Sequence, residues 1–420
     1  MGAGPGRGWL IVAVVFLGAG LTVGSSNYAF GLFVEPLENE FGWRRTYISA
    51  SLSFMALGSL FGPLIGRLMD RHGARPVMVA SLVVLAVSFA LRPLMTDLWH
   101  WYVLSALQFL AFYGAAILPA GRLVGLWFPR TRGRAMAAAT MGNNFGGLLV
   151  PPLVAVAIGA DGSWQTAYLG LGLAALALAI AAALVVTEPG SGKASSRARG
   201  TLDRRVESSV GIGGWTPRQA MRSRAFFAVA LAIMLGNFTY TIILGHVFAH
   251  MEVREISGTT AALAVSVLAA CGMAGKLVLG YLTERVPARF VMMVAFGGQI
   301  IGIIMMLTLL SGATIWLAVG LFGFFMGSFG TLSPLQVQDT FGIRSFGTIM
   351  GLVSATTVIS FGLGPLIAGL SYDLSGGYGP AFIAAAMMFG LALVVLTQAS
   401  ASPPPDSRRS SIVGAREDPR

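Results

Sequence analysis

Twelve apolar stretches, each about 20 residues or longer, are the feature that most restricts what this 420-residue chain can fold into. A bilayer core about 30 Å thick requires about 20 apolar residues per helix, so each stretch can cross a membrane once. Only 11% of the residues are charged, against about 25% in soluble domains, which leaves too little polar surface for a water-soluble globule. The predicted spans are residues 9–33, 47–67, 76–96, 100–127, 133–158, 164–187, 224–249, 259–282, 289–311, 314–337, 347–371 and 379–399.

The positive charges indicate the orientation of these spans. If the N-terminus is cytoplasmic, 22 of the 28 Lys and Arg residues fall in cytoplasmic segments. The positive-inside rule therefore predicts that both termini are cytoplasmic, in agreement with an even number of spans. The net charge of +11 reflects this topology, so we expect a lipid bilayer around the protein and no nucleic-acid partner. The basic residues are almost all Arg, and the sequence shows no targeting segment. Both features favour a bacterial inner (plasma) membrane.

The longest polar interruption divides the chain into two halves. Residues 188–222 are rich in Gly, Ser and Arg and follow the sixth span, a composition typical of a flexible loop. Thr216 and Pro217 predict a short capped helix at its end. We expect an N-terminal six-helix half over 1–187, a cytoplasmic central loop over 188–222, a C-terminal six-helix half over 223–400 and a disordered cytoplasmic tail over 401–420.

Each half repeats the other at a fixed offset of 214 residues. Residues 66–75, GRLMDRHGAR, recur as residues 280–289, GYLTERVPAR. At the same offset, Arg130, Gly133, Met136 and Pro151 match Arg344, Gly347, Met350 and Pro365. Parallel duplication of a six-helix unit is typical of a transporter whose substrate site lies near mid-membrane between the halves. The predicted fold is therefore an all-α membrane protein with twelve transmembrane helices in two six-helix halves, working as a monomer.

Residues 66–75 resemble the loop signature between the second and third helices of the major facilitator superfamily, and the span count, central loop and duplication also fit. Residues 127–135, WFPRTRGRA, and 141–146, MGNNFG, are similar to the corresponding segment of monocarboxylate porters and bacterial oxalate:formate antiporters. Residues 27–33, NYAFGLF, and 41–43, FGW, resemble the same branch. The resemblance implies alternating-access transport of a small organic anion, such as lactate, pyruvate or formate, with or without a coupled proton.

The resemblance also implies a gate. In this superfamily the loop acid and its arginines form a charge network that holds the cytoplasmic side closed in the outward-facing state. The matching residues are Asp70, Arg71, Arg75, Glu284 and Arg285. Membrane anchoring by positive charge is the alternative, but anchoring needs no acid such as Asp70.

Lys276 is the clearest candidate for a substrate contact. A charge inside the bilayer costs several kcal/mol and is retained for a reason. Gly272, Gly275 and Gly280 let neighbouring helices approach closely and would direct Lys276 into the bundle. In the resembling porters, a basic residue four positions before the equivalent of Gly280 receives the substrate carboxylate, which implies this role for Lys276. The alternative is that its side chain extends to the cytoplasmic interface.

Further polar residues lie at depths where the two halves would face one cavity. Arg122 is a candidate for a second anion contact, with extension to the interface as the alternative, and Arg92 is expected at the outer interface. The uncharged candidates could instead serve as hydrogen-bonding links between helices. They are Asn27, Tyr28, Asn143, Asn144, Asn237, Tyr240, Thr356 and Thr357. Together with Lys276 they would form a small polar pocket with apolar walls, suited to a short organic acid.

Two departures from the family pattern concern the substrate and the coupling ion. Oxalate:formate antiporters carry a second basic residue where this chain has Thr357, and one interior cation suits a monoanion better than a dianion. Animal monocarboxylate porters place an Asp where this chain has Gly272, and no acid falls deep in a predicted span. Proton coupling would then depend on Lys276 or His246, or else the protein is a facilitator or an exchanger.

Two other functions have weaker support in the sequence. Efflux of amphipathic compounds is the main alternative, but the usual interior acid is absent and residues 145–152, FGGLLVPP, match the usual fifth-helix motif only loosely. A membrane enzyme would need clustered His, Asp or Glu side chains, whereas the four His residues are scattered. We therefore expect a protein that is not an enzyme, with no cofactor, metal or catalytic residue.

Overall fold

The computed structural model describes residues 5–161, 163–188, 214–309 and 312–399. These residues are almost entirely helical, and twelve of the helical segments are long and apolar enough to cross a membrane. The predicted all-α fold with twelve spans is therefore confirmed. Residues 189–213 and 400–420, which include most of the predicted loop and all of the predicted tail, lie outside the described residues.

Six spans form the first half, and a separate helix, α2 (Phe30–Phe41), connects the first span to the second. The first span consequently ends at Tyr28, earlier than predicted. The spans comprise α1 (Pro5–Val23) with η1 (Gly24–Tyr28); α3 (Arg45–Ala50), η2 (Ser51–Phe54) and α4 (Met55–His72); α5 (Ala74–Ala90) with η3 (Arg92–Leu94); α6 (Leu98–Phe112), η4 (Tyr113–Ile117) and α7 (Leu118–Trp127); α8 (Arg132–Asp161); and α9 (Trp164–Val185).

The second half follows the short helix α11 (Pro217–Met221). Thr216 caps α11 as predicted, because its hydroxyl accepts a hydrogen bond from the Gln219 N–H at 3.3 Å. The remaining spans comprise α12 (Arg224–Gly236), η5 (Thr239–Leu244) and α13 (Gly245–Val253); α14 (Gly258–Leu282); α15 (Ala288–Thr308); α16 (Thr314–Phe341); α17 (Phe346–Thr356) with α18 (Val358–Ser375); and α19 (Gly379–Leu396).

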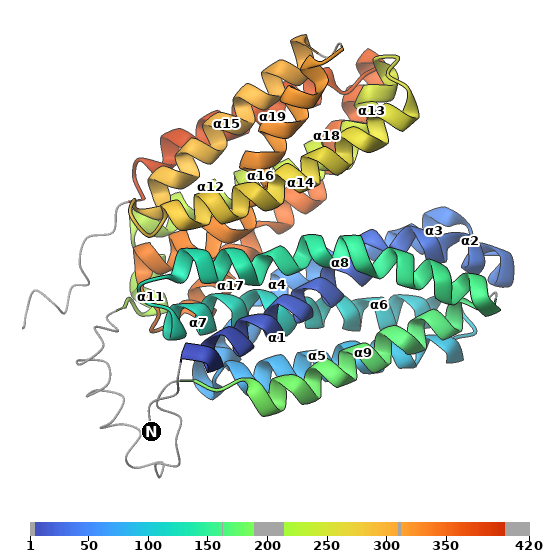
Figure 1. Ribbon diagram of the computed structural model, residues 1–420, viewed down its shortest axis with the longest axis horizontal. Coiled ribbons are helices and arrows are strands. Elements are labelled where there is room, and N and C mark those ends of the chain that lie inside the picture. The colour runs from blue at the N-terminus through green and yellow to red at the C-terminus, as the bar shows by residue number, and fades with distance from the viewer. Residues whose placement is uncertain (1–4, 162, 189–213, 310–311, 400–420) are drawn as a thin grey trace, which may run out of the picture.

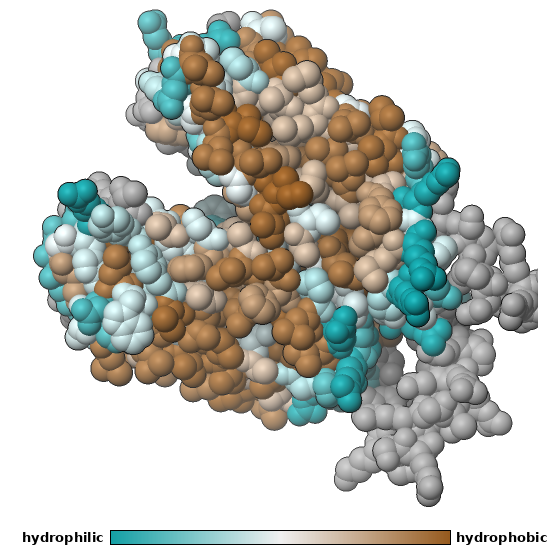
Figure 2. Space-filling view, turned by 180° about the vertical axis from the view of Figure 1, so that it is seen from behind, coloured by the Kyte–Doolittle hydropathy of each residue, from teal (hydrophilic) through white to brown (hydrophobic). Residues whose placement is uncertain are grey.

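The two halves meet at one end of the molecule and diverge at the other. In Figure 1 they converge near α11 and the start of α1, which we call the closed end. Figure 2, seen from behind, shows a broad cleft between the halves at the opposite end, which we call the open end. Hydrophobic side chains cover much of the outer surface along the helices in the same view, as expected for a surface in contact with lipid.

Glycines allow the two halves to touch at the closed end. A Cβ atom on Gly66 of α4 would lie 1.9 Å from the carbonyl oxygen of Gly347 in α17. Likewise, a Cβ atom on Gly133 of α8 would lie 1.9 Å from the carbonyl oxygen of Gly280 in α14. Only glycine permits helix backbones to approach this closely. Because Gly66 matches Gly280 and Gly133 matches Gly347 in the repeat, the two contacts are related by the internal symmetry.

Three spans contain a π-helical turn that the sequence pattern does not reveal. These turns are η1, η4 and η5, in the first, fourth and seventh spans. π-Helical turns insert an extra residue into an α-helix and occur frequently at functional sites. Here η1 carries Tyr28, η4 carries Tyr113 and η5 carries Tyr240.

Candidate functional site

Lys276 lies on α14 at the boundary between the halves. One turn further along α14, Gly280 packs against Gly133 of α8. On the other side, a Cβ atom on Gly275 would lie 1.7 Å from the carbonyl oxygen of Phe324 in α16. These close approaches hold α14 between α8 and α16. The Lys276 side chain is consequently buried, with 5% of the residue's surface exposed, and does not extend to a membrane interface.

Two neutral oxygens of α8 receive the Lys276 ammonium group. Its Nζ donates to the carbonyl oxygen of Thr140 at 3.0 Å and to Oδ1 of Asn144. Lys276 therefore links the second half to the first. Within the described ranges, no carboxylate forms an ion pair with it. When protonated, the Lys276 amine presents a positive charge that no described carboxylate neutralises and with which an anion can pair.

Thr140 and Thr331 make a second contact between the halves beside Lys276. Their hydroxyl oxygens are 2.6 Å apart, and Thr331 is fully buried on α16. Neither residue is among the candidates that the sequence suggests. Thr140 precedes Asn144 by one helical turn, so its position on the same face of α8 was a usable signal. Asn143 lies on a neighbouring face, is half-buried and makes no side-chain hydrogen bond with another described residue.

A second polar chain crosses between the halves through α17 and α4. The Thr357 hydroxyl donates to the carbonyl oxygen of Ser354 at 2.7 Å and lies 3.4 Å from Ser59 Oγ, which is 2.8 Å from the Tyr113 hydroxyl. The structure thus brings the sequence candidate Thr357 to the boundary between the halves. Ser59 and Tyr113 were missed because single hydroxyl residues in apolar spans form no pattern. Thr356 likewise donates to the carbonyl oxygen of Val353 at 2.7 Å, and its hydroxyl lies 3.4 Å from the carbonyl oxygen of Ala230 in α12 of the same half.

Tyr28 and Tyr240 lie on π-helical turns of opposite halves. The Tyr28 ring packs over Gly147 of α8, where an added Cβ atom would lie 2.9 Å from the ring. The Tyr240 ring packs beside Phe329 of α16, with centroids 6.1 Å apart. The turns η1 and η5 thus each carry one of the two tyrosine candidates.

The remaining asparagine candidates, Asn27 and Asn237, take no part in the described hydrogen bonds between the halves. Asn27 is exposed next to Tyr28, and its side chain bonds to no other described residue. The Asn237 side chain donates to the carbonyl oxygen of Ile233 at 2.8 Å, one turn earlier in α12. This bond satisfies part of the Asn237 amide within its own helix, so the structure gives Asn237 less freedom to contact a ligand.

Arg122, the sequence candidate for a second anion contact, belongs to an ion-pair cluster at the closed end. Its guanidinium donates to Asp70 at 3.2 Å and to Glu188 at 2.9 and 3.1 Å. The three side chains are only 14–19% exposed. Glu188 also accepts the Ala74 N–H at 2.7 Å, at the start of α5. Two carboxylates neutralise Arg122, so it offers no free charge to an anionic substrate.

Asp70 connects this cluster to the second half. Its carboxylate accepts the Gly347 N–H at 3.0 Å, the Thr348 N–H at 2.7 Å and the Thr348 hydroxyl at 2.6 Å. These donors lie in the first turn of α17, where unpaired N–H groups and the helix dipole favour a carboxylate. Asp70 therefore bridges the two halves at the closed end.

The other gating candidates differ in how much they contribute to the closed end. Glu284 accepts the Arg134 N–H and its Nε–H, both at 3.1 Å, and thereby joins α8 to the end of α14. Arg285 donates to the Tyr281 hydroxyl at 2.6 Å within its own half. Arg71 and Arg75 are exposed and form no ion pair within the described segments. An ion pair between Arg132 and Asp339 adds a further link between the halves.

Arg92 is buried in the first half, and its predicted interfacial position is wrong. Only 2% of its surface is exposed. The guanidinium donates to the Tyr168 hydroxyl at 2.7 Å and to Gln108, and lies over the Trp101 ring at 4.3 Å from its centroid. Gln108 in turn donates to Ser26 of η1 at 2.8 Å. Arg92 thus ties together four spans and reaches the π-helical turn that carries Tyr28.

Within the described residues, no three His, Cys, Asp or Glu side chains are close enough to hold a metal ion. His246, the second sequence candidate for proton coupling, is half-buried on α13. Its Nδ1 lies 3.0 Å from the carbonyl oxygen of Ile242, and its ring centroid is 5.2 Å from that of Tyr378.

Curated relatives of this chain are transporters. It is 27% identical over 397 residues to monocarboxylate transporter 11 of Homo sapiens, an alignment that covers 91% of this chain and 81% of the relative. It is 22% identical over 389 residues to the uncharacterized MFS-type transporter YcxA of Bacillus subtilis, with 90% and 91% covered. It is 23% identical over 384 residues to monocarboxylate transporter 13 of Rattus norvegicus, with 90% and 86% covered.

Solved transporter structures share the fold. The proton:xylose symporter XylE bound to 6-bromo-6-deoxy-D-glucose matches with a TM-score of 0.75 at 15% identity, covering 94% of this chain and 96% of that chain. FucP in the outward conformation matches with a TM-score of 0.66 at 15% identity, covering 94% and 99%. The family model of the Major Facilitator Superfamily matches residues 15–353 and 255–418. This chain is therefore an integral, multi-pass membrane protein that belongs to the Major Facilitator Superfamily, whose members carry small-molecule substrates.

Proposed function

We propose that this protein carries a small monocarboxylate, of the lactate, pyruvate or formate class, across the membrane by alternating access. Lys276 is the proposed anchor for the substrate carboxylate. The single observation that carries the proposal is the buried Lys276 ammonium at the boundary between the halves, held only by the neutral oxygens of Thr140 and Asn144. The names of the human and rat relatives, monocarboxylate transporters 11 and 13, support the same substrate class.

The hydrogen bonds of Lys276 suggest how the substrate acts on the two halves. An ammonium group has three N–H donors, and α8 uses two of them. A carboxylate can accept the third, and its charge then competes with Asn144 and Thr140 for the others. Substrate binding thereby weakens the link between α14 and α8. The halves can then separate at the closed end and approach each other at the open end.

A single cation without a carboxylate partner at the boundary favours a substrate with one negative charge. Lys276 is the only Lys or Arg side chain that lies buried at this boundary without a carboxylate partner among the described residues, since Arg122 is neutralised by Asp70 and Glu188. A dianion would leave one carboxylate without a cation in a low-dielectric site. Tyr28, Tyr240 and Thr357 offer hydroxyl groups for the rest of a short polar acid.

We assign the closed end to the cytoplasm, so that the structure represents an outward-facing state. The described cations near that end include Arg67, Arg130, Arg222 and Arg289, as the positive-inside rule requires. An Arg-rich composition and the bacterial relative YcxA support a bacterial inner membrane. Because one chain supplies both sides of the Lys276 site, we propose that the monomer is the working unit.

Uptake into proteoliposomes tests the proposal. Radiolabelled lactate, pyruvate, formate, oxalate and a longer 2-hydroxy acid are offered to the wild type, Lys276→Ala and Lys276→Arg at two external pH values. We expect uptake of one or more monocarboxylates, its loss in Lys276→Ala and partial retention in Lys276→Arg. Arg218→Ala, which removes one exposed positive charge on α11, is the control for a general effect of charge.

Two outcomes would contradict the proposal. If Lys276→Ala transports as well as the wild type, Lys276 does not anchor the substrate. If no carboxylate is carried by correctly folded wild-type protein, the substrate class is wrong.

The pH dependence of uptake tests proton coupling. A pH dependence that disappears in His246→Gln assigns proton coupling to His246. A pH dependence that disappears only in Lys276→Arg assigns proton coupling to Lys276. Uptake that is independent of pH indicates a facilitator or an exchanger.

The efflux alternative has no support in the compared relatives. An exporter of amphipathic cations is also disfavoured by the buried, unneutralised charge of Lys276.

A further inference from the structure

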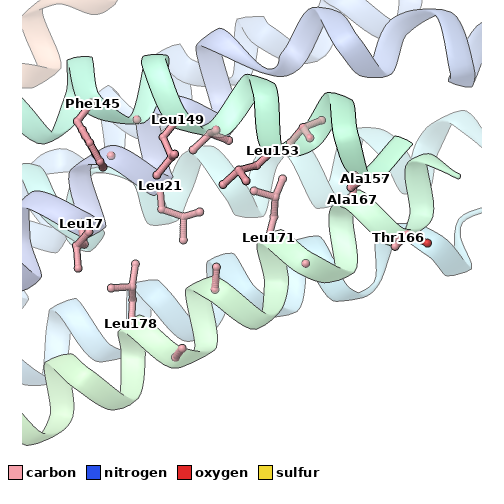
Figure 3. A pocket seen from close by; sticks show the side chains of 17 residues that line it. Leu17, Leu21, Phe145, Leu149, Leu153, Ala157, Thr166, Ala167, Leu171 and Leu178 are labelled. Atoms are coloured by element: carbon pink, nitrogen blue, oxygen red, sulfur yellow. The ribbon is translucent and has the colours of Figure 1, made fainter. Parts of the chain in front are cut away.

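An apolar groove lies within the first half, and neither Lys276 nor its partners Thr140 and Asn144 line it. Its volume is about 520 Å³, within the range of small-molecule sites, and it lies between α8 and α9 with α1 as its floor. Figure 3 shows Leu171 and Leu178 of α9 facing Leu149 and Leu153 of α8, with Leu21 of α1 behind them. Apart from Thr166, every residue that lines the groove is Leu, Val, Ala, Gly or Phe.

Close packing of α1 and α8 creates the floor of this groove. A Cβ atom on Gly146 of α8 would lie 1.9 Å from the carbonyl oxygen of Gly20 in α1, so these two helices touch through their backbones. Between Leu171 and Leu178, in contrast, α9 lines the groove only with Ala174 and Ala177, and a Cβ atom on Gly170 would meet no atom within 4 Å. The groove forms because α1 and α8 pack closely against each other, whereas the small side chains of α9 leave space between α8 and α9.

The position of the groove indicates its occupant. Leu153 at its edge is 59% exposed, and Leu173 on the adjoining face of α9 is 68% exposed, so the groove opens onto the surface that bilayer hydrocarbon covers. From Thr166 to Leu178 the α9 helix rises about 18 Å, close to the roughly 15 Å of a single leaflet. Thr166, the one polar lining residue, lies in the first turn of α9, at the open end.

We propose that this groove binds one acyl chain of a phospholipid from the leaflet at the open end, with the headgroup beside Thr166 and the chain running toward Leu178. The occupant is a lipid chain because the groove is apolar along its length, polar only where a headgroup would lie, and continuous with the lipid-facing surface. The bound chain fills the space between α8 and α9. It thereby braces α8, the helix whose Thr140 and Asn144 hold Lys276.

Photo-crosslinking tests this proposal independently of transport. Purified full-length protein is reconstituted with phosphatidylethanolamine that carries a diazirine on its acyl chain, irradiated, digested and mapped by mass spectrometry. We expect labelling at Leu171 and Leu178 severalfold above that at Leu173 and Leu184, although Leu171 is 7% exposed and Leu184 is 73% exposed. Labelling that instead increases with surface exposure overturns the proposal, because it indicates bulk lipid without a site.

Matched variants sharpen the result. Ala174→Trp places a large ring in the groove and is expected to abolish the labelling of Leu171 and Leu178, whereas Leu173→Trp, at the adjacent lipid-facing position, preserves it. Gly170→Leu replaces Ala174→Trp if the latter misfolds. Unchanged labelling in a folded groove variant contradicts the proposal. Labelling of the groove by a diazirine fatty acid but not by the diazirine phospholipid also contradicts the proposal. A crosslink in the groove to a second copy of the chain would do the same.

Discussion

Asp70 and Glu284 occupy equivalent places in the two halves and make the same backbone contact with the opposite half. Asp70 accepts the Thr348 N–H at 2.7 Å, and Glu284 accepts the Arg134 N–H at 3.1 Å. Both the two acids and the two donors are 214 positions apart. The surroundings of the two acids nevertheless differ. Asp70 pairs with the mostly buried Arg122, which also pairs with Glu188, whereas Glu284 pairs with Arg134, whose side chain is 53% exposed. The two acids should therefore contribute unequally to the stability of the closed end.

Asp70→Asn is expected to open the closed end. The substitution weakens charge-assisted hydrogen bonds to Thr348 and Gly347, which are worth about 1.5–3 kcal/mol. The population with the closed end open should rise about ten- to a hundredfold. The measurement is the alkylation rate of Ala137→Cys, a buried position on α8, in a Cys271→Ser background. Glu284→Gln should raise this rate less, and equal rates in the two variants would refute the proposed inequality.

Asn144→Asp is expected to impair anion uptake without unfolding the protein. An aspartate at this position would pair with the Lys276 ammonium and compete with the substrate carboxylate at high effective concentration. We expect the KM for uptake to rise by on the order of tenfold or more. Asn143→Asp is the matched control, because Asn143 makes no contact with Lys276. A KM that is unaffected in Asn144→Asp would argue against a substrate carboxylate at Lys276.

Gly66→Ala is expected to destabilise the closed end by overpacking. Its methyl group would lie 1.9 Å from the Gly347 carbonyl oxygen, and such overlap costs about 1–3 kcal/mol or forces the helices apart. Transport should fall while the folded protein remains. Two cysteine pairs that each join the two halves, one pair at the closed end and one at the open end, would measure this shift. The crosslinking yield should fall for the pair at the closed end and rise for the pair at the open end. Gly390→Ala, whose methyl group meets no atom within 4 Å, should behave as the wild type.

Arg92→Met is expected to destabilise the first half. Removal of the guanidinium leaves the Tyr168 hydroxyl and the Gln108 carbonyl oxygen buried without a donor, at a cost of about 1–3 kcal/mol each. The thermal unfolding temperature of purified protein should fall. Arg92→Lys should restore little of it, because a lysine cannot span Tyr168 and Gln108 in the planar geometry of a guanidinium. Unfolding temperatures equal to that of the wild type in both variants would show that this network contributes nothing to stability.

The fold was largely predictable from the sequence. Apolar length determines that a helix spans the bilayer, because a bilayer offers no water to satisfy an exposed backbone. The offset of 214 residues also predicted that the halves are equivalent, and the pairing of Gly66 with Gly347 and of Gly133 with Gly280 follows that symmetry. Lys276 was identifiable by itself, because a charge in an apolar span is costly and therefore conspicuous.

Tertiary structure alone decided which polar groups meet. Arg122 and Lys276 look alike in the sequence, yet Glu188 and Asp70 neutralise the first, whereas only Thr140 and Asn144 contact the second. Ser59, Tyr113 and Thr331 gave no pattern, because a hydroxyl in an apolar helix is significant only when another helix brings it a partner. Helix length is a local property that one segment carries by itself. Charge neutralisation depends on distances between spans far apart in the chain, and only their packing sets those distances.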